Sequence, residues 1–183
     1  MKNGLLLVDL QNDYFPGGRM ELVGMEAAAG NAGLLLAEFR RTSSPVIHVQ
    51  HVSARPGAVF FLPGTEGVEI HKSVAPAKGE PVVVKNYPNA FRGTSLLEIL
   101  KNAHVDTLVL CGAMTHMCID ATARAAFDFG FRCLVAEDAC ATRDLSFQGK
   151  SIKAAEVHAA FMAALSAPYA GIVSTRDILK KKA

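Results

Sequence analysis

Cys118 is the cysteine whose place in the sequence best suits nucleophilic chemistry. It follows an apolar run and a short turn that contains Gly112, and a helix-like segment continues after it. In the first turn of a helix, unpaired backbone N–H groups and the helix dipole favour a thiolate, and the same N–H groups can stabilise an oxyanion. The other cysteines are expected to fill the core, as cysteines commonly do; they are Cys111, Cys133 and Cys140.

Two charged residues end other apolar runs and could assist this thiol. Asp9 closes the run Leu5–Val8, where an unpaired buried carboxylate would be costly, so it either pairs with a charge or caps a neighbouring loop. Lys85 ends the run Val82–Val84 and could simply extend to water. Beside a buried carboxylate, however, a lysine is the natural charge partner. Ligands of open α/β sheets bind outside the carboxyl ends of the strands, where both residues are expected to lie.

The histidines give no metal-ligand pattern. His48 and His51 are three residues apart on one predicted strand, so their side chains point to opposite faces and cannot hold one metal ion together. His51 closes that strand and is expected to line a pocket. His116 lies close to Cys118 and could be the base of a Cys–His pair, although a side chain in a turn can equally point outward. We therefore predict no metal.

Short apolar runs alternate with longer helix-like segments along the chain. Their continuous hydrophobicity indicates strands that are covered on both faces, as in a parallel sheet. The predicted strands are 4–10, 45–52, 81–85, 107–112 and 131–136, with 171–174 as a sixth candidate, and the predicted helices are 26–41, 95–102, 117–129 and 151–166. This alternation favours a doubly wound α/β sandwich. The irregular segment 53–79 is expected to act as a lid or a binding loop.

The net charge, the length of the first apolar run and the glycine pattern argue against several classes of protein. The 183 residues predict a single domain, 1–183, and a net charge of +2 is too balanced to suggest nucleic-acid binding. The first apolar run is too short for a secretory signal or a membrane span, so we expect a cytoplasmic protein with reduced cysteines. The turn after this run lacks the G-x-G-x-x-G pattern, which argues against a dinucleotide-binding domain.

Three parts of the sequence together resemble the isochorismatase-like cysteine hydrolase family. They are the segment 9–13 (Asp-Leu-Gln-Asn-Asp), Lys85 with Phe91 and Thr94 downstream, and the segment 112–124 (Gly-Ala-Met-Thr-His-Met-Cys-Ile-Asp-Ala-Thr-Ala-Arg). The resemblance extends over essentially the whole chain, in the family's order and approximate spacing. The cysteine segment is fairly specific, whereas the other two gain their weight in combination.

This resemblance implies a catalytic triad. Asp9 would deprotonate Cys118, and Lys85 would stabilise the charge, so that the thiolate attacks a carbonyl and forms a thioester that water hydrolyses. The N–H groups of Met114 and Cys118 would bind the oxyanion, after a cis peptide bond between Ala113 and Met114. The implied α/β fold is a Rossmann-like three-layer α/β/α sandwich with a six-stranded parallel sheet. We expect no cofactor, and because members usually assemble as dimers or tetramers, we expect a homodimer or homotetramer.

The branches of the family differ at positions that can be read here. The retained Cys118 argues against cleavage of an enol ether by a true isochorismatase, because those enzymes lack the nucleophile. Nicotinamidases typically carry a metal-binding Asp-x-His after the second strand, and the corresponding segment here is His-Val-Ser at 51–53. The form of the cysteine segment resembles the streptothricin hydrolase-type branch, which opens a cyclic amide.

The predicted function is hydrolysis of an amide or lactam C–N bond in a small molecule, within a pocket of aromatic side chains. The expected pocket residues are Phe15, His51, Phe60, Phe61, Tyr87, Phe91 and Ala113. Packing in the core or in a subunit interface explains Phe60 and Phe61 equally well. The alternative function is a redox or ligand-binding protein that keeps this fold without hydrolysis. The lack of a nearby resolving cysteine motif weighs against redox chemistry.

Overall fold

The sheet at the centre of the computed structural model, which describes residues 2–180, has six strands in the order β3-β2-β1-β4-β5-β8. Every pairing between neighbours in this sheet is parallel. The strands are β1 (Asn3–Val8), β2 (Val46–His51), β3 (Val82–Lys85), β4 (Thr107–Ala113), β5 (Arg132–Ala141) and β8 (Gly171–Val173). The predicted strands are thus confirmed, including the sixth candidate.

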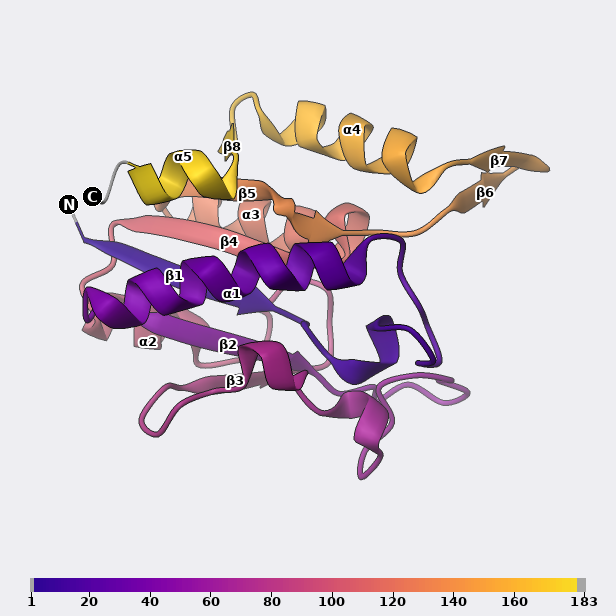
Figure 1. Ribbon diagram of the computed structural model, residues 1–183, viewed down its shortest axis with the longest axis horizontal. Coiled ribbons are helices and arrows are strands. Elements are labelled where there is room, and N and C mark those ends of the chain that lie inside the picture. The colour runs from indigo at the N-terminus through magenta and orange to yellow at the C-terminus, as the bar shows by residue number, and fades with distance from the viewer. Residues whose placement is uncertain (1, 181–183) are drawn as a thin grey trace.

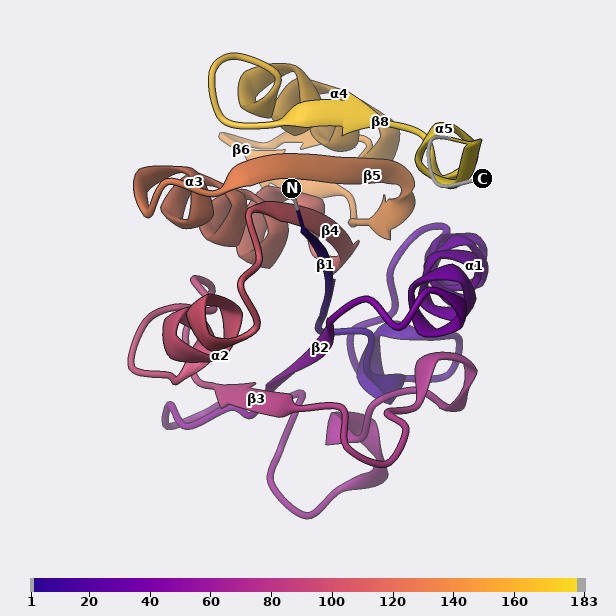
Figure 2. The same ribbon diagram turned by 90° about the vertical axis from the view of Figure 1, so that its left-hand side faces the viewer.

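Helices cover both faces of this sheet. On one face lie α1 (Met25–Arg41) and α5 (Thr175–Lys180), and on the other lie α2 (Leu96–Asn102), α3 (Asp120–Asp128) and α4 (Ala154–Leu165) (Figure 2). The architecture is therefore the predicted three-layer α/β/α sandwich with a six-stranded parallel sheet.

The two helical layers explain why the strands are continuously apolar. In β1, Leu5 and Leu7 pack into the core beneath α1, whereas Leu6 and Val8 pack into the core on the opposite face. Successive side chains of a strand point to opposite faces, so a strand buried on both sides needs apolar residues at every position.

The segment after β5 differs from the prediction. After β5, a hairpin of β6 (Leu145–Phe147) and β7 (Lys150–Ile152) projects from the body of the molecule (Figure 1). The predicted start of a helix at residue 151 was therefore wrong, because residues 151 and 152 pair within this hairpin and α4 begins only at Ala154. Two carboxylates bind the free N–H groups at this start: Glu156 accepts from the N–H of Lys153 at 3.0 Å and Asp144 accepts from the N–H of Ala154 at 2.8 Å.

The long irregular loop between β2 and β3 is held against the end of β1. The Gln11 side chain donates to the carbonyl of Val68 at 2.7 Å, and the N–H of Phe61 donates to Asp13 Oδ2 at 2.6 Å. Gly67 lies so close to the Asp13 carboxylate that a Cβ atom there would overlap it. These contacts fix the loop as one wall beside the carboxyl ends of the strands. None of the helices within residues 2–180 is long and apolar enough to cross a membrane.

Candidate active site

The three proposed catalytic side chains meet at the carboxyl edge of the sheet. Asp9 follows β1, Lys85 is the last residue of β3, and Cys118 lies in the helical turn Thr115–Ile119 that connects β4 to α3. Parallel strands bring their carboxyl ends to the same edge, which is why residues so far apart in the sequence converge. The register pairs Lys85 with His51 of β2, so the lysine reaches the site across that strand.

The Lys85 ammonium is the centre of the cluster. Its Nζ lies 2.7 Å from Asp9 Oδ2 and 3.3 Å from Cys118 Sγ. It also lies 3.0 Å from Nδ1 of His51. An ammonium has three donors and no acceptor, so these contacts use all of its hydrogen-bonding capacity. Asp9 and Lys85 are buried, at 0% and 1% exposure, so each charge depends on the other for its stability.

Asp9 leaves one carboxylate oxygen without a hydrogen bond. Among residues 2–180, Oδ1 of Asp9 is a buried atom that has no hydrogen-bond partner. A carboxylate oxygen of Asp9 and Sγ of Cys118 lie within 4.8 Å of one another. The Asp9 backbone has a positive φ of 52°, a conformation that aspartate tolerates better than most residues. A buried carboxylate that has an unused lone pair and lies in the same cluster as a thiol is suited to take up its proton.

The resting state of Cys118 differs from the sequence-based expectation of a stabilised thiolate. Burial raises the pKa of the Cys118 thiol, the Asp9 carboxylate raises it further, and the Lys85 ammonium offsets these effects only in part. The cysteine is therefore a neutral thiol at physiological pH. Proximity to a helix start does not outweigh a buried carboxylate, so this nucleophile needs a general base.

Lys85 and His51 differ in charge: the lysine is a cation and the histidine is neutral. Burial opposes charging of Lys85, but Asp9 and Cys118 outweigh that effect and raise its pKa, so the ammonium persists. Burial and the neighbouring Lys85 lower the pKa of His51 to about 4, so its imidazole is neutral at physiological pH. The site thus holds a lysine cation and a neutral histidine in contact.

Three side chains of this cluster also have the spacing of a potential metal site. A carboxylate oxygen of Asp9, a ring nitrogen of His51 and Sγ of Cys118 lie within 4.8 Å of one another, which is the spacing of a potential metal site. Lys85 Nζ contacts all three side chains, so a metal cation there would have to displace an ammonium. His48 faces the other way and binds Glu80 at 2.8 Å, as expected for a residue three positions from His51.

Contacts on the side of β1 and on the side of β5 hold the turn that carries Cys118 in place. At Gly112 the backbone φ is 126°, and a Cβ atom would overlap the carbonyl of Val8, so only glycine lets β4 pass β1 here. The peptide bond between Ala113 and Met114 is cis. His116 binds Thr142 Oγ1 at 2.6 Å, on the side of β5, and this contact occupies the histidine that could have paired with Cys118.

Cys118 opens onto a cavity of about 290 Å³. The segments after β1, β2, β3 and β4 all contribute to its wall, and its lining includes Tyr14, His51, Ser53, Arg55, Phe60, Asn86, Tyr87, Met114 and Cys118. A cavity of this size suits a small molecule, with a few polar groups to orient it.

The expected pocket residues fall into two groups. His51, Phe60 and Tyr87 line the cavity. Four others lie elsewhere: Phe15 stacks on His71, Phe61 packs against Tyr14, Phe91 packs against Phe129, and Ala113 is buried in the strand. The sequence points to the right segments, but it does not tell which of two adjacent aromatic residues faces inward.

Tyr14 and Arg55 line the cavity but were not predicted. Tyr14 lies in a short 3-10 helix, Asn12–Tyr14, which turns it inward in place of Phe15. Arg55 belongs to the irregular loop, where no periodic pattern reports the direction of a side chain. A basic residue in a loop next to predicted site residues is the only signal that could have indicated it.

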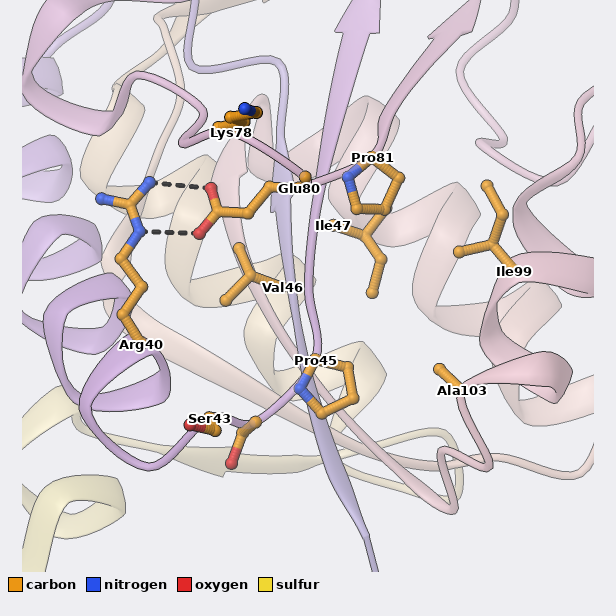
Figure 3. A pocket seen from close by; sticks show the side chains of 12 residues that line it. Arg40, Ser43, Pro45, Val46, Ile47, Lys78, Glu80, Pro81, Ile99 and Ala103 are labelled. Atoms are coloured by element: carbon orange, nitrogen blue, oxygen red, sulfur yellow. Dashed lines mark hydrogen bonds and ion pairs between the residues drawn. The ribbon is translucent and has the colours of Figure 1, made fainter.

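A second hollow of about 420 Å³ lies at the opposite end of β2 and β3 (Figure 3). Its lining includes Pro45 and Pro81, which immediately precede these strands, and the bidentate ion pair of Arg40 with Glu80. No cysteine lines this hollow. The catalytic candidates therefore converge on the smaller cavity.

A family model described as the isochorismatase domain matches residues 3–169 of the chain. The chain belongs to the isochorismatase family. A family protein of Bacillus subtilis, YddQ, whose function is uncharacterised, is 52% identical over 180 residues, which are 98% of this chain and 100% of that protein. A crystal structure of an isochorismatase-family hydrolase from Oleispira antarctica is also 52% identical, covers 98% of this chain and 96% of the other, and superposes with a TM-score of 0.94.

Two relatives within the isochorismatase family carry names that state an activity. A streptothricin hydrolase of Streptomyces noursei is 38% identical over 141 residues, which are 77% of this chain and 50% of that enzyme. A maleamate amidohydrolase of Pseudomonas putida is 29% identical over 194 aligned positions, covering 98% of this chain and 86% of that enzyme. Membership of the family and the presence of hydrolases of this kind among the relatives agree with the resemblance in the sequence.

Proposed function

We propose that this protein is an amidohydrolase that cleaves an amide or lactam C–N bond of a small molecule through a thioester on Cys118. The observation that carries the proposal is that the Lys85 ammonium holds together the buried Asp9 carboxylate, whose Oδ1 has no hydrogen-bond partner among residues 2–180, and the neutral Cys118 thiol, which lines the cavity. Relatives named as a streptothricin hydrolase and a maleamate amidohydrolase support this class of reaction.

In the acylation half, Asp9 takes the proton of Cys118 as Sγ attacks the substrate carbonyl carbon. Lys85 keeps contact with both side chains and stabilises the negative charge while it moves from carboxylate to sulfur. When the C–N bond breaks, the leaving nitrogen takes the proton from Asp9, and a thioester remains on Cys118.

In the deacylation half, water attacks the thioester carbon. Asp9 takes a proton from this water, the C–S bond breaks, and the proton returns to Cys118 as the carboxylic acid leaves. In both halves the carbonyl oxygen gains negative charge, and we assign the backbone N–H groups of Met114 and Cys118 to bind it. Both residues line the cavity, as this role requires.

Redox chemistry at Cys118 has less support. Oxidation of a cysteine depends on thiolate character and exposure, and this thiol is neutral and only 5% exposed. Cleavage of an enol ether would leave the Cys118 nucleophile without a role. The expected assembly into homodimers or homotetramers and the expected cytoplasmic location stay predictions.

The test is release of ammonia or amine from a panel of small primary amides, lactams and ureides, with maleamate included. Wild-type protein is expected to hydrolyse at least one of them, and Cys118→Ala is expected to abolish turnover while retaining the fold. Mass spectrometry of a quenched reaction should find the acyl mass on the peptide that carries Cys118.

Cys133→Ala is the matched control, because Cys133 is a buried thiol whose Sγ contacts backbone carbonyls in the core. Its activity should stay at the wild-type level. Undiminished turnover in Cys118→Ala, or an acyl group on another residue, would refute the proposed nucleophile.

A further inference from the structure

His51 contacts the proposed catalytic lysine and also lines the cavity. One ring nitrogen, Nδ1, is 3.0 Å from Lys85 Nζ, and the residue is half-buried in the cavity wall. The backbone of His51 is held at both polar groups by the Gln11 side chain, at 2.7 Å and 2.9 Å. The Phe61 ring packs beside the imidazole with 5.9 Å between centroids. The ring therefore has one fixed position relative to Lys85.

Contact with Lys85 determines which ring nitrogen carries the proton. An ammonium can only donate, so Nδ1 of His51 must accept through its lone pair. Burial and Lys85 lower the pKa of His51 to about 4, so the ring is neutral at physiological pH. A neutral imidazole with an unprotonated Nδ1 carries its single proton on Nε2.

The Nε2–H group is then an unused donor. Within residues 2–180, His51 Nε2 has no hydrogen-bond partner, yet it is not among the buried atoms that lack one, which are Asp9 Oδ1 and His48 Nδ1. His51 lines the cavity, and Nε2 is the ring nitrogen that Lys85 leaves free. A donor without a partner, on a ring fixed against the catalytic lysine, is placed to bind whatever fills that space.

We infer that His51 binds the substrate by donating its Nε2–H to a carbonyl or carboxylate oxygen of the bound molecule. This inference rests on the proposed function and adds a requirement for the substrate, namely an acceptor oxygen within reach of β2. Lys85 would then have two roles, since it contacts the reacting groups and also fixes the tautomer of a substrate-binding histidine.

Three substitutions of His51 separate binding of the substrate from simple support of Lys85. In His51→Asn, a short side chain can still offer an acceptor near the position of Nδ1, but it cannot reach the position of Nε2. In His51→Gln, the longer side chain can place an amide N–H near Nε2 while it moves away from Lys85. His51→Phe removes both groups and keeps a ring of similar shape.

The experiment measures kcat and KM of the three variants on the fastest amide of the panel. We expect His51→Asn and His51→Phe to lose about tenfold in kcat/KM, mainly through KM, as for loss of one hydrogen bond. His51→Gln should retain more activity than His51→Asn. The opposite order, with His51→Asn the more active, would overturn the inference, because it would show that only the contact with Lys85 matters.

A second measurement needs no substrate. Long-range proton–nitrogen NMR spectra of the wild-type protein at pH 7 report the tautomer of each histidine, and the His51 signals are identified by their absence in His51→Gln. An Nε2–H tautomer is expected, whereas an Nδ1–H tautomer or an imidazolium would overturn the inference. If the wild-type protein hydrolyses none of the amides, the proposed function fails, and the tautomer still decides whether His51 presents a donor.

Discussion

At opposite ends of the sheet, the chain builds two clusters from the same kinds of group: a carboxylate, a cation and a histidine. At the carboxyl ends of the strands these are Asp9, Lys85 and His51. At the amino ends they are Glu80 and Arg40, which line the hollow of Figure 3, and His48, which contacts Glu80. The composition of a cluster therefore does not decide what it does.

The two carboxylates differ in how fully their oxygens are bonded. Both oxygens of Glu80 accept hydrogen bonds from Arg40, and Oε2 also contacts His48 and the N–H of Ala77. Asp9 is more deeply buried, and its Oδ1 has no hydrogen-bond partner among residues 2–180. A fully bonded carboxylate stabilises its surroundings, whereas a buried carboxylate with a free lone pair beside a thiol can accept a proton.

The largest difference between the clusters should be in catalysis. Asp9→Asn is expected to lower kcat by about 10² to 10⁴, because an amide cannot take the proton of Cys118. The matched change in the other cluster, Glu80→Gln, should leave kcat unchanged. Steady-state assays on the fastest amide, with circular dichroism to confirm folding, test this pair. An Asp9→Asn variant that kept more than about a tenth of wild-type kcat would show that another group is the base.

Removing Lys85 should lower the stability of the fold much more than removing Arg40. Lys85→Met leaves Asp9 as a buried charge without a partner and is expected to lower the free energy of unfolding by about 3 to 5 kcal/mol. Arg40→Met removes an ion pair whose arginine side chain is 36% exposed, and it should cost at most about 1 kcal/mol.

Urea denaturation of both variants measures this difference. Equal losses of unfolding free energy would mean that water reaches the Lys85 cluster and screens it as it screens Arg40. Retention of the wild-type unfolding slope would confirm that the two variants unfold from a comparably compact state.

The sequence predicted the sheet and pointed to Asp9, Lys85 and Cys118 for reasons that are local in each case. A strand such as β1, apolar at every position, indicates burial on both faces whatever its neighbours are. Asp9 and Lys85 stand out because each ends such a strand, and the convergence of strand ends then follows from the parallel sheet.

The lining of the cavity was harder to predict because it depends on the direction of single side chains. Tyr14 faces the cavity in place of Phe15 because of one turn of 3-10 helix, and Arg55 lies in a loop without periodicity. The protonation of Cys118 also escaped sequence reasoning. It depends on the balance between burial, Asp9 and Lys85, and that balance exists only once the chain is folded.

Within these clusters, His51 and Glu80 should respond to acid in different pH ranges. The folded pKa of His51 is lowered to about 4, below the ordinary value of 6.5, so unfolded chains bind the proton first. The stability that neutral His51 contributes is thus present above pH 6.5 and is lost as the pH falls through 4. The ion pair with Arg40, acting against burial, lowers the pKa of Glu80 to about 2, so its contribution is lost between about pH 4.5 and 2.

Urea unfolding between pH 7 and 3, compared between the wild type, His51→Gln and Glu80→Gln, resolves these two ranges. His51→Gln should reduce the decline below pH 6.5, to which the other histidines with lowered pKa values also contribute; these are His48, His71, His116 and His158. Glu80→Gln should flatten the curve between about pH 4.5 and 2. Activity of the folded protein should fall as the pH passes through about 4, because a protonated His51 beside Lys85 places two cations in contact and removes the acceptor that holds the ammonium. A decline between pH 6.5 and 4 as large in His51→Gln as in the wild type would show that protonation of His51 does not contribute to it, against the lowered pKa that burial and Lys85 give this histidine.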